Sequence, residues 1–244
     1  RDIVFSLGHI IHNTDVVNEL ARQGLRTVDE IEEIASGTVL IRSHGATTDQ
    51  LKEIEHKGLS VVDATCVLVK RIQKIGHELN RDGYKVVVIG DEHHPEVKAI
   101  MGYAGDVAVI GSKDDLHQLS SHEKLGVICQ TTQNPDHFAN MVAEIVKRGF
   151  SELKVINTLC REAIKRQQSA VELCRNVDVM FVLGGLHSAN TRKLAELCKK
   201  HNKNTFHLQN WQELDIKTLC DIKTVGVTAG ASTPDRVIQE FVDN

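Results

Sequence analysis

The pattern of apolar and polar residues around position 90 predicts a strand, a turn and a helix in direct succession. Four β-branched apolar residues, Val86–Ile89, are typical of a buried strand, which Gly90 ends. A polar tip with His94 and Glu96 follows, and apolar residues then recur at helical spacing from Val97 onward. Taken alone, this is an ordinary polar loop with a proline near the helix start.

The same arrangement occurs three times along the chain. Each time an apolar run ends at a glycine, a polar residue suited to a helix start stands four positions later, and a helical pattern follows. The three pairs are Gly8 and His12, Gly90 and His94, and Gly184 and Ser188. Repetition at a fixed offset indicates a repeated architecture, and polar groups at the carboxyl ends of parallel strands are where α/β proteins bind ligands.

Two cysteines occupy matching places in this repeat. The runs Leu59–Cys66 and Leu153–Cys160 each predict a strand that ends on a cysteine, followed by a basic helical segment. Cys66 precedes Gly90 by 24 residues, and Cys160 precedes Gly184 by the same 24. The same step back from Gly8 falls before residue 1, so we expect a third cysteine upstream of the sequence given.

A third apolar run completes each repeat and ends in small, polar or imidazole groups. These runs are Val39–Gly45, Leu125–Thr132 and Val225–Ser232. The other periodic segments predict an amphipathic segment over 27–34, helices over 49–56, 70–81, 138–148, 168–175, 190–201 and 237–242, a short helix over 114–119, and short strands over 105–110 and 205–208.

The sequence therefore predicts an α/β protein: a trefoil of three small pseudo-repeated α/β units with mostly parallel sheets around a central cavity. The expected units are residues 1–65 with 233–244, residues 66–159, and residues 160–232, the first being incomplete at its N-terminal side. The chain has no Pro- or Gly-rich linker, so we expect tight packing.

Composition narrows the functional classes. The net charge is −4 and aromatic residues make up 4% of the 244, which argues against a nucleic-acid surface; we also expect no membrane partner. Six cysteines without a pairing pattern suit a reducing compartment, so a cytoplasmic protein is expected, or a plastid one if a transit peptide once preceded it. Four of the cysteines lie in strand or helix patterns and are expected to be buried: Cys129, Cys174, Cys198 and Cys220.

Three such units would direct their strand ends toward one cavity. The expected lining is His12, His44, His94, Glu96, Thr131, Thr132, Ser188, Asn190 and Ser232. Side chains of this kind at helix starts suit a phosphate or diphosphate without a basic patch. Cys66 and Cys160 would suit zinc or a three-cysteine [4Fe–4S] cluster with one open iron, and duplication without any metal is the alternative.

Glu96 is the carboxyl group of this predicted cavity. A carboxyl near imidazoles and apolar residues can be tuned to deliver a proton. The alternative is an ordinary carboxylate in the first turn of a helix, where it complements the helix dipole.

Eight short motifs, taken together, resemble the LytB family of 4-hydroxy-3-methylbut-2-enyl diphosphate reductases. They occur in the family's order and span nearly the whole chain. The motifs are His12–Val17, Ser43–Gly45, Asp63–Cys66, His94–Val97, Gln130–Thr132, Asn157–Cys160, Ser188–Thr191 and Gly226–Ser232.

The resemblance implies a [4Fe–4S] cluster held by Cys66 and Cys160, and reductive removal of an allylic hydroxyl to give isopentenyl and dimethylallyl diphosphates, the last step of the non-mevalonate isoprenoid pathway. Glu96 would deliver the proton that lets water leave, with Thr131 in support. The residues implied at the substrate are His12, His44, His94, Thr131, Thr132, Ser188, Asn190 and Ser232. An electron donor such as ferredoxin or flavodoxin is the implied protein partner.

The chain departs from the family's pattern at several points. The family's first cysteine is absent, Val67 replaces a usual proline, and Leu186 stands where a polar residue is usual. Ala163 and Ala189 replace a common threonine and serine. Two alternatives therefore stay open: a catalytically incomplete fragment that binds diphosphate, or another three-cysteine [4Fe–4S] trefoil enzyme of the quinolinate synthase type.

Overall fold

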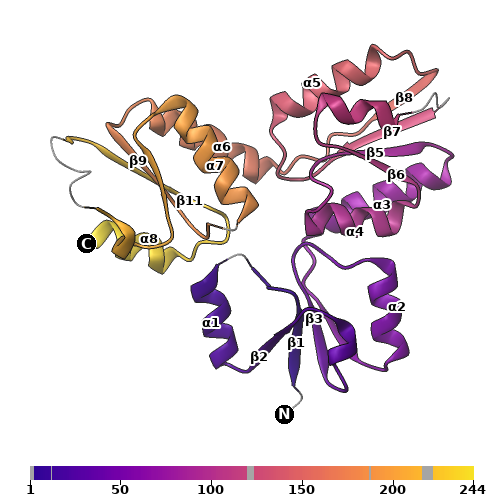
Figure 1. Cartoon of the computed structure of the whole chain (residues 1–244), viewed down its shortest axis with the longest axis horizontal. Coiled ribbons are helices and arrows are strands. Elements are labelled where there is room, and N and C mark those ends of the chain that lie inside the picture. Colours follow the sequence, from indigo (N-terminus) through magenta and orange to yellow (C-terminus); the bar gives the residue numbers. More distant parts are fainter. Residues whose placement is uncertain (1–2, 12, 120–123, 187, 216–221) are drawn as a thin grey trace. The chain divides into compact units, whose positions relative to one another are not determined.

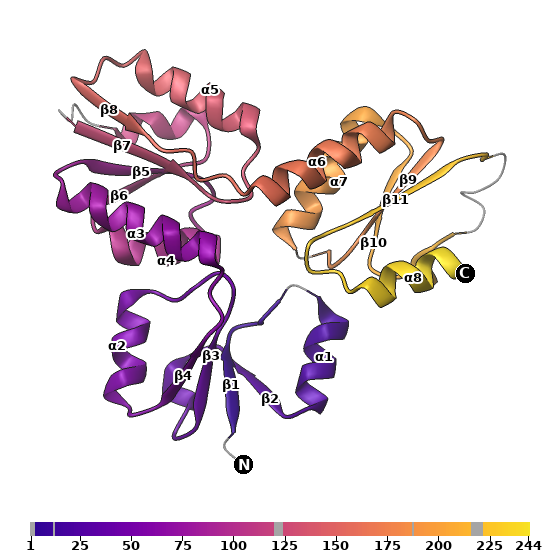
Figure 2. The ribbon, with the colours of Figure 1, turned by 180° about the vertical axis from the view of Figure 1, so that it is seen from behind.

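The computed structural model describes residues 3–11, 13–119, 124–186, 188–215 and 222–244. Its strands form three separate sheets, each flanked by helices (Figures 1 and 2). The chain divides into two compact units: unit 1 is Arg1–Ile10 with Gly24–Cys160, and unit 2 is Ile11–Gln23 with Arg161–Asn244. Within the described ranges, no helix is both long and apolar enough to cross a membrane.

The first sheet of unit 1 has the strand order β2-β1-β3-β4, with every pairing parallel. Its strands are β1 Val4–Leu7, β2 Leu25–Val28, β3 Thr38–Ile41 and β4 Ser60–Asp63. Alternate residues such as Phe5 and Val39 share one face, as the two-residue period of a strand requires. They pack against Ile31 of the 3₁₀ turn η1 (Ile31–Glu33) and Ile54 of α2 (Thr48–His56).

The second sheet of unit 1 is parallel as well, in the order β6-β5-β7-β8, and is covered on both faces. Its strands are β5 Lys85–Ile89, β6 Val107–Ile110, β7 Lys124–Cys129 and β8 Glu152–Val155. Val86 and Val88 pack with α3 (Val67–Arg81) and α4 (Pro95–Ala104), while Val87 and Ile89 pack with η2 (Lys113–Gln118) and α5 (Pro135–Val146). Burial on both faces explains why β5 reads as a continuous apolar run.

The third sheet lies in unit 2 and has the parallel order β10-β9-β11 among the described residues. Its strands are β9 Val179–Leu183, β10 Thr205–Leu208 and β11 Val225–Ala229. Met180 and Val182 pack with α6 (Arg161–Cys174) and α7 (Ala189–His201), while Phe181 packs with Phe241 of α8 (Asp235–Asp243). Unit 2 also contains α1 (Thr14–Arg22) and η3 (Trp211–Glu213); Glu19 of α1 pairs with Arg236 of α8 at 3.5 Å.

The predicted fold class is confirmed: the protein is α/β, with three parallel sheets flanked by helices. The division into 1–65 with 233–244, 66–159 and 160–232 stays a prediction, as does the central cavity. In this structure α8 belongs to unit 2 and buries Phe241 in its core. Cys129, Cys174 and Cys198 are buried as expected, whereas Cys220 lies outside the described residues.

One detail of the sequence prediction is wrong, because the strands before Cys66 and Cys160 do not end on the cysteines. β4 ends at Asp63 and β8 at Val155. Beyond β4, Asp63 Oδ1 accepts the N–H of Thr65 at 2.9 Å. Beyond β8, Asn157 Oδ1 accepts the N–H of Leu159 at 3.0 Å. A side-chain oxygen that bonds the backbone two residues on forms an Asx turn, which competes with the sheet ladder and ends each extended segment.

Candidate active site

Cys66 and Cys160 stand at equivalent points of the two sheets of unit 1. Each follows an Asx turn and directly precedes a helix, α3 or α6. The Cys66 N–H donates to the Ser43 carbonyl at 3.0 Å, and the Cys160 N–H donates to the Thr131 carbonyl at 2.8 Å. Both thiols are free, with Cys66 exposed and Cys160 half-buried. The two cysteines are therefore accessible sulfur donors with fixed backbones.

Glu96 and Thr131 form a buried pair at the carboxyl edge of the second sheet. The Thr131 N–H donates to Glu96 Oε1 and the Thr131 hydroxyl donates to Glu96 Oε2, both at 2.7 Å. Glu96 is only 2% exposed and Thr131 is 6% exposed. Two short hydrogen bonds from one residue fix the plane of the carboxylate.

Local sequence explains how α4 presents Glu96. Strand β5 stops before Gly90, where an added Cβ would lie 3.1 Å from the Cβ of Gln130, so a glycine lets the loop after β7 approach closely. His94 is the N-cap of α4, and its Nδ1 accepts the N–H of Glu96 at 3.2 Å. Because Nδ1 is an acceptor here, a neutral His94 has its proton on Nε2. Pro95 at the first helical position presets the backbone for the helix.

His44, in the loop after β3, lies against His94. The two rings meet edge to face, with centroids 5.2 Å apart and an angle of 89° between their planes. The next residue, Gly45, has φ +81°, and an added Cβ there would lie 2.7 Å from Gln73 Nε2. A glycine at position 45 therefore allows the loop that carries His44 to adopt this conformation next to Gln73. Contacts thus run without a gap from His44 through His94, Glu96 and Thr131 to Cys160.

Thr132 follows Thr131 but makes a different contact. Its hydroxyl accepts a hydrogen bond from Gln130 Nε2 at 3.3 Å, and Gln130 Oε1 accepts the N–H of Asp91 at 3.2 Å. Gln130 is fully buried. Thr132 is therefore linked to the loop after β5 and helps to hold the two strand ends together.

Ser188, Asn190 and Ser232 all lie in unit 2, near the carboxyl ends of β9 and β11. Ser188 is the N-cap of α7 and its Oγ accepts the N–H of Thr191 at 3.3 Å. Asn190 is half-buried in the first turn of that helix, and Ser232 is half-buried in the turn after β11. The first turn of α7 has no acidic residue, so the positive end of its dipole is not neutralised there.

The predicted site residues thus fall into two groups. Unit 1 contains Cys66, Cys160, His44, His94, Glu96, Thr131 and Thr132, and unit 2 contains Ser188, Asn190 and Ser232. His12 lies outside the described residues. In the part of the chain that the structure describes, no group of three or more His, Cys, Asp or Glu residues converges as a metal site.

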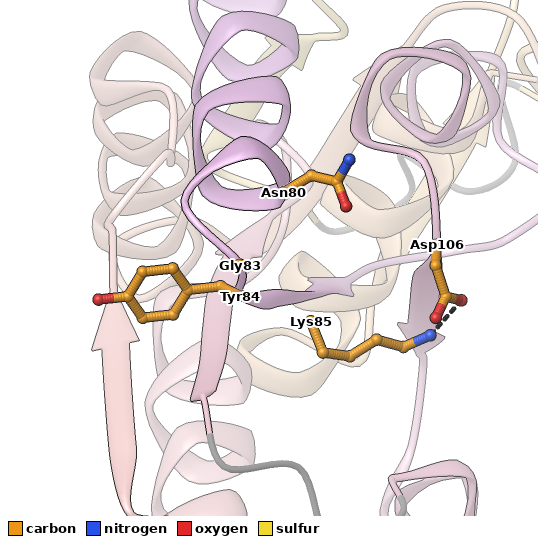
Figure 3. A pocket seen from close by; sticks show the side chains of 5 residues that line it. All are labelled: Asn80, Gly83, Tyr84, Lys85 and Asp106. Carbon is orange, nitrogen blue, oxygen red and sulfur yellow. Dashed lines mark ion pairs between the residues drawn. The ribbon is translucent and has the colours of Figure 1, made fainter.

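A pocket of about 230 Å³ lies at the amino edge of the second sheet (Figure 3). Its lining is Asn80, Gly83, Tyr84, Lys85 and Asp106, with an ion pair between Lys85 and Asp106. The Tyr84 hydroxyl donates to Glu152, and that hydrogen bond raises the pKa of Tyr84. In a parallel sheet the amino edge is opposite the edge where ligands bind, so we assign this pocket no role in the site.

Three polar residues near the strand ends were not singled out from the sequence. Arg42 Nη1 donates to the His9 carbonyl at 3.4 Å, and burial lowers the pKa of this guanidinium. His207 lies 3.0 Å from the Gly184 carbonyl through Nε2, and burial lowers its pKa. Thr191 is fully buried in α7. Arg42 and His207 interrupt or follow short apolar runs, which is the signal that could have identified them; Thr191 gives no such signal.

Comparison with known proteins shows to which family the chain belongs. A sequence model of the LytB protein family matches residues 1–244. A 4-hydroxy-3-methylbut-2-enyl diphosphate reductase of Geobacter sulfurreducens is 45% identical over 240 residues, covering 98% of this chain and 85% of the relative. The reductase of the same name from Thermoanaerobacter sp. (strain X514) is 39% identical over 243 residues, covering 98% and 84%.

Two solved structures agree with this placement. The structure of (E)-4-hydroxy-3-methyl-but-2-enyl diphosphate reductase, described as the terminal enzyme of the non-mevalonate pathway, matches with a TM-score of 0.74 at 40% identity, over 100% of this chain and 88% of that one. A reductase from Plasmodium falciparum matches with a TM-score of 0.92 at 24% identity, over 100% and 78%, and shows the shared fold alone. The chain therefore belongs to the LytB family and is an oxidoreductase of that family.

Proposed function

We propose that the protein reduces 4-hydroxy-3-methylbut-2-enyl diphosphate to isopentenyl and dimethylallyl diphosphates. The names of its relatives support this substrate, and the contacts in unit 1 support the chemistry. The observation that carries the proposal is Thr131, which holds Glu96 through two hydrogen bonds and accepts the N–H of Cys160. The proposed proton donor and one proposed sulfur ligand are thereby hydrogen-bonded to the same residue.

The reaction consumes two electrons and two protons and releases water. The allylic C–O bond breaks, the hydroxyl leaves as water with one proton, and a C–H bond forms with the other. Hydroxide is a poor leaving group, so a proton has to reach the hydroxyl oxygen as the bond breaks. Glu96 in its protonated form is a suitable source. With the 2.7 Å hydrogen bond between Glu96 Oε2 and the Thr131 hydroxyl reversed, Thr131 would accept the Glu96 proton and give its own hydroxyl proton to the substrate.

The residues of unit 2 suit the diphosphate end of the substrate. Ser188, Asn190 and Ser232 offer neutral hydrogen-bond donors beside the N-terminus of α7, whose dipole favours an anion. His12, His44 and His94 are further proposed ligands, and neutral or charged imidazoles can both donate to phosphate oxygens. Side chains of these kinds can bind an anion without a patch of lysine and arginine, which the sequence also lacks.

An iron–sulfur group fits the sulfur donors. Cys66 and Cys160 are free thiols with fixed backbones, each at the start of a helix, and thiolates are the usual ligands of such clusters. We infer that they are two of the thiolates that would hold a [4Fe–4S] cluster. When bound, the cluster would supply the two electrons, received from a donor such as ferredoxin or flavodoxin.

A cytoplasmic location stays a prediction.

Anaerobic turnover tests the proposal directly. The protein, with its iron and sulfide content measured, is supplied with the diphosphate substrate and a reduced donor, and the products are identified by mass spectrometry. We expect both isoprenoid diphosphates and one water released per two electrons consumed. A cluster-loaded protein that leaves the substrate unchanged, or that converts it without consuming electrons, would contradict the proposal.

A further inference from the structure

Thr191, in the first turn of α7, has a buried hydroxyl that no described protein group satisfies. The residue is 0% exposed, and its Oγ1 has no hydrogen-bond partner in the described part of the chain. Its backbone N–H is already bonded to Ser188 Oγ at 3.3 Å. The side-chain hydroxyl of Thr191 is therefore buried away from water and has no partner among the described residues.

Two glycines make room for this hydroxyl at the carboxyl ends of neighbouring strands. Gly184 follows β9 and Gly230 follows β11, and these strands are paired in the sheet. An added Cβ at Gly184 would lie 3.0 Å from Thr191 Oγ1, and one at Gly230 would lie only 2.1 Å from it. The hydroxyl therefore lies over the sheet edge, where any side chain at position 230 would displace it.

Packing alone does not account for a threonine at this position. Burying a hydroxyl without a partner is unfavourable, whereas valine has nearly the same shape and avoids that cost. A threonine here is explained if the hydroxyl gains a partner from outside the protein. The surroundings define that partner: the first backbone N–H groups of a helix lack intrahelical acceptors, and the first turn of α7 has no acidic residue. Asn190 lies in the same turn, and Ser232 comes two residues after Gly230.

We propose that Thr191 is a further ligand of the diphosphate, donating its hydroxyl proton to a phosphate oxygen at the N-terminus of α7. This inference rests on the proposed function and adds a residue to its anion site. Thr191 contributes binding and orientation only, because the reacting hydroxyl is at the other end of the substrate. The two glycines then leave free the space that this hydroxyl occupies.

The test compares Thr191→Val, which removes the hydroxyl and keeps the shape, with Thr191→Ser, which keeps the hydroxyl and loses a methyl group. Binding of inorganic diphosphate to the full chain is measured by calorimetry, and the melting temperature of each variant is measured without ligand. We expect Thr191→Val to bind about ten- to a hundredfold more weakly, the range for losing one hydrogen bond to a charged group, at an equal or higher melting temperature. Thr191→Ser should bind like the wild type, even if it melts earlier. In the cluster-loaded enzyme, Thr191→Val should raise KM while leaving kcat nearly unchanged.

Three outcomes would overturn the inference, and they differ in what else they affect. If the wild type and Thr191→Val bind diphosphate equally, the hydroxyl is no ligand, and the proposed function is untouched. If Thr191→Ser loses as much affinity as Thr191→Val, the effect comes from packing. If the wild type binds no diphosphate, the anion site of the proposed function fails together with this inference.

Discussion

Glu96→Gln is the substitution that separates proton delivery from structure most cleanly. Glutamine has the shape of glutamate, so the Thr131 N–H can still donate to Oε1 as it does now at 2.7 Å. The Thr131 hydroxyl, which now donates to Oε2, would turn to accept a hydrogen bond from the new Nε2. Both contacts survive with one reversed in direction, and only the acid is lost.

The structure sets the size of the two expected effects. Each hydrogen bond is worth about 1 kcal/mol net, and both are kept, so we expect the free energy of unfolding to change by no more than about 1 kcal/mol. Glu96→Ala would instead leave a cavity and two unsatisfied donors at a site that is 2% exposed, costing about 2–5 kcal/mol. Turnover by Glu96→Gln should fall on the order of 10²–10⁴-fold, the usual range for removing a general acid.

The assay is anaerobic turnover with a reduced donor, run beside urea denaturation and iron and sulfide analysis of each variant. Thr131→Val and Thr131→Ser are the matched controls: valine removes the bridging hydroxyl and should lower turnover at least about tenfold, while serine should not. Near-wild-type turnover by Glu96→Gln, with the cluster verified, would remove Glu96 from the mechanism and make His94 the next proton donor to test.

Three other predictions follow from single contacts. Asn190→Ala should weaken binding of the diphosphate substrate about ten- to a hundredfold and barely affect an alcohol analogue without the diphosphate; equal weakening of both ligands would refute an anion contact. Gly45→Ala should lower the free energy of unfolding in urea by about 1–3 kcal/mol, because its φ is +81° and the new Cβ would lie 2.7 Å from Gln73 Nε2. Gly58→Ala is the control: its φ is +65° and nothing surrounds the new Cβ, so it introduces backbone strain without a steric clash and should lower the free energy of unfolding by less. Equal losses for the two variants would contradict a clash at Gln73. Burial raises the pKa of Cys198 from the ordinary 9.0 to about 12, so above pH 9 the unfolded chain releases a proton that the folded chain keeps. Its contribution to stability is therefore complete below pH 9 and falls by up to ~1.4 kcal/mol per pH unit as the pH rises toward 12. Urea titrations at pH 8 and pH 10 should show a steeper loss for wild type than for Cys198→Ala, and parallel losses would rule this origin out.

The repeated strand ends could be predicted from the sequence because β5 and β9 are buried on both faces and read as unbroken apolar runs. Strand β2 could not, since Leu25–Val28 is only four residues long and includes Arg26 and Thr27. Helix α6 covers both the predicted basic helical segment after Cys160 and the predicted helix over 168–175. That they form one helix could not be predicted, because the first turns are polar and buried residues begin only at Ala170.

The sequence suggests candidate residues for the site but not the contacts among them. The glycine offset places Glu96 at a strand end, and the family motif adds Thr131. Their hydrogen bonds depend on β5 and β7 being neighbours in the sheet, which the order of elements along the chain does not specify. The buried hydroxyl of Thr191 is a property of three-dimensional packing against two glycines, so a pattern of apolar and polar residues contains no trace of it.

The membership of α1 in unit 2 has a consequence for the order of folding. All residues of unit 1 in this sequence have been synthesised once residue 160 is added, whereas unit 2 joins residues 11–23 to 161–244. The ion pair between Glu19 and Arg236 closes a loop of 217 residues, and the entropic cost of closure rises with loop length. None of the residues of α1 is fully buried, so few contacts offset that cost. During synthesis, α1 therefore cannot make its contacts with unit 2 until the rest of that unit has been synthesised. In the folded protein, α1 should be among the first segments to exchange their amide hydrogens with solvent.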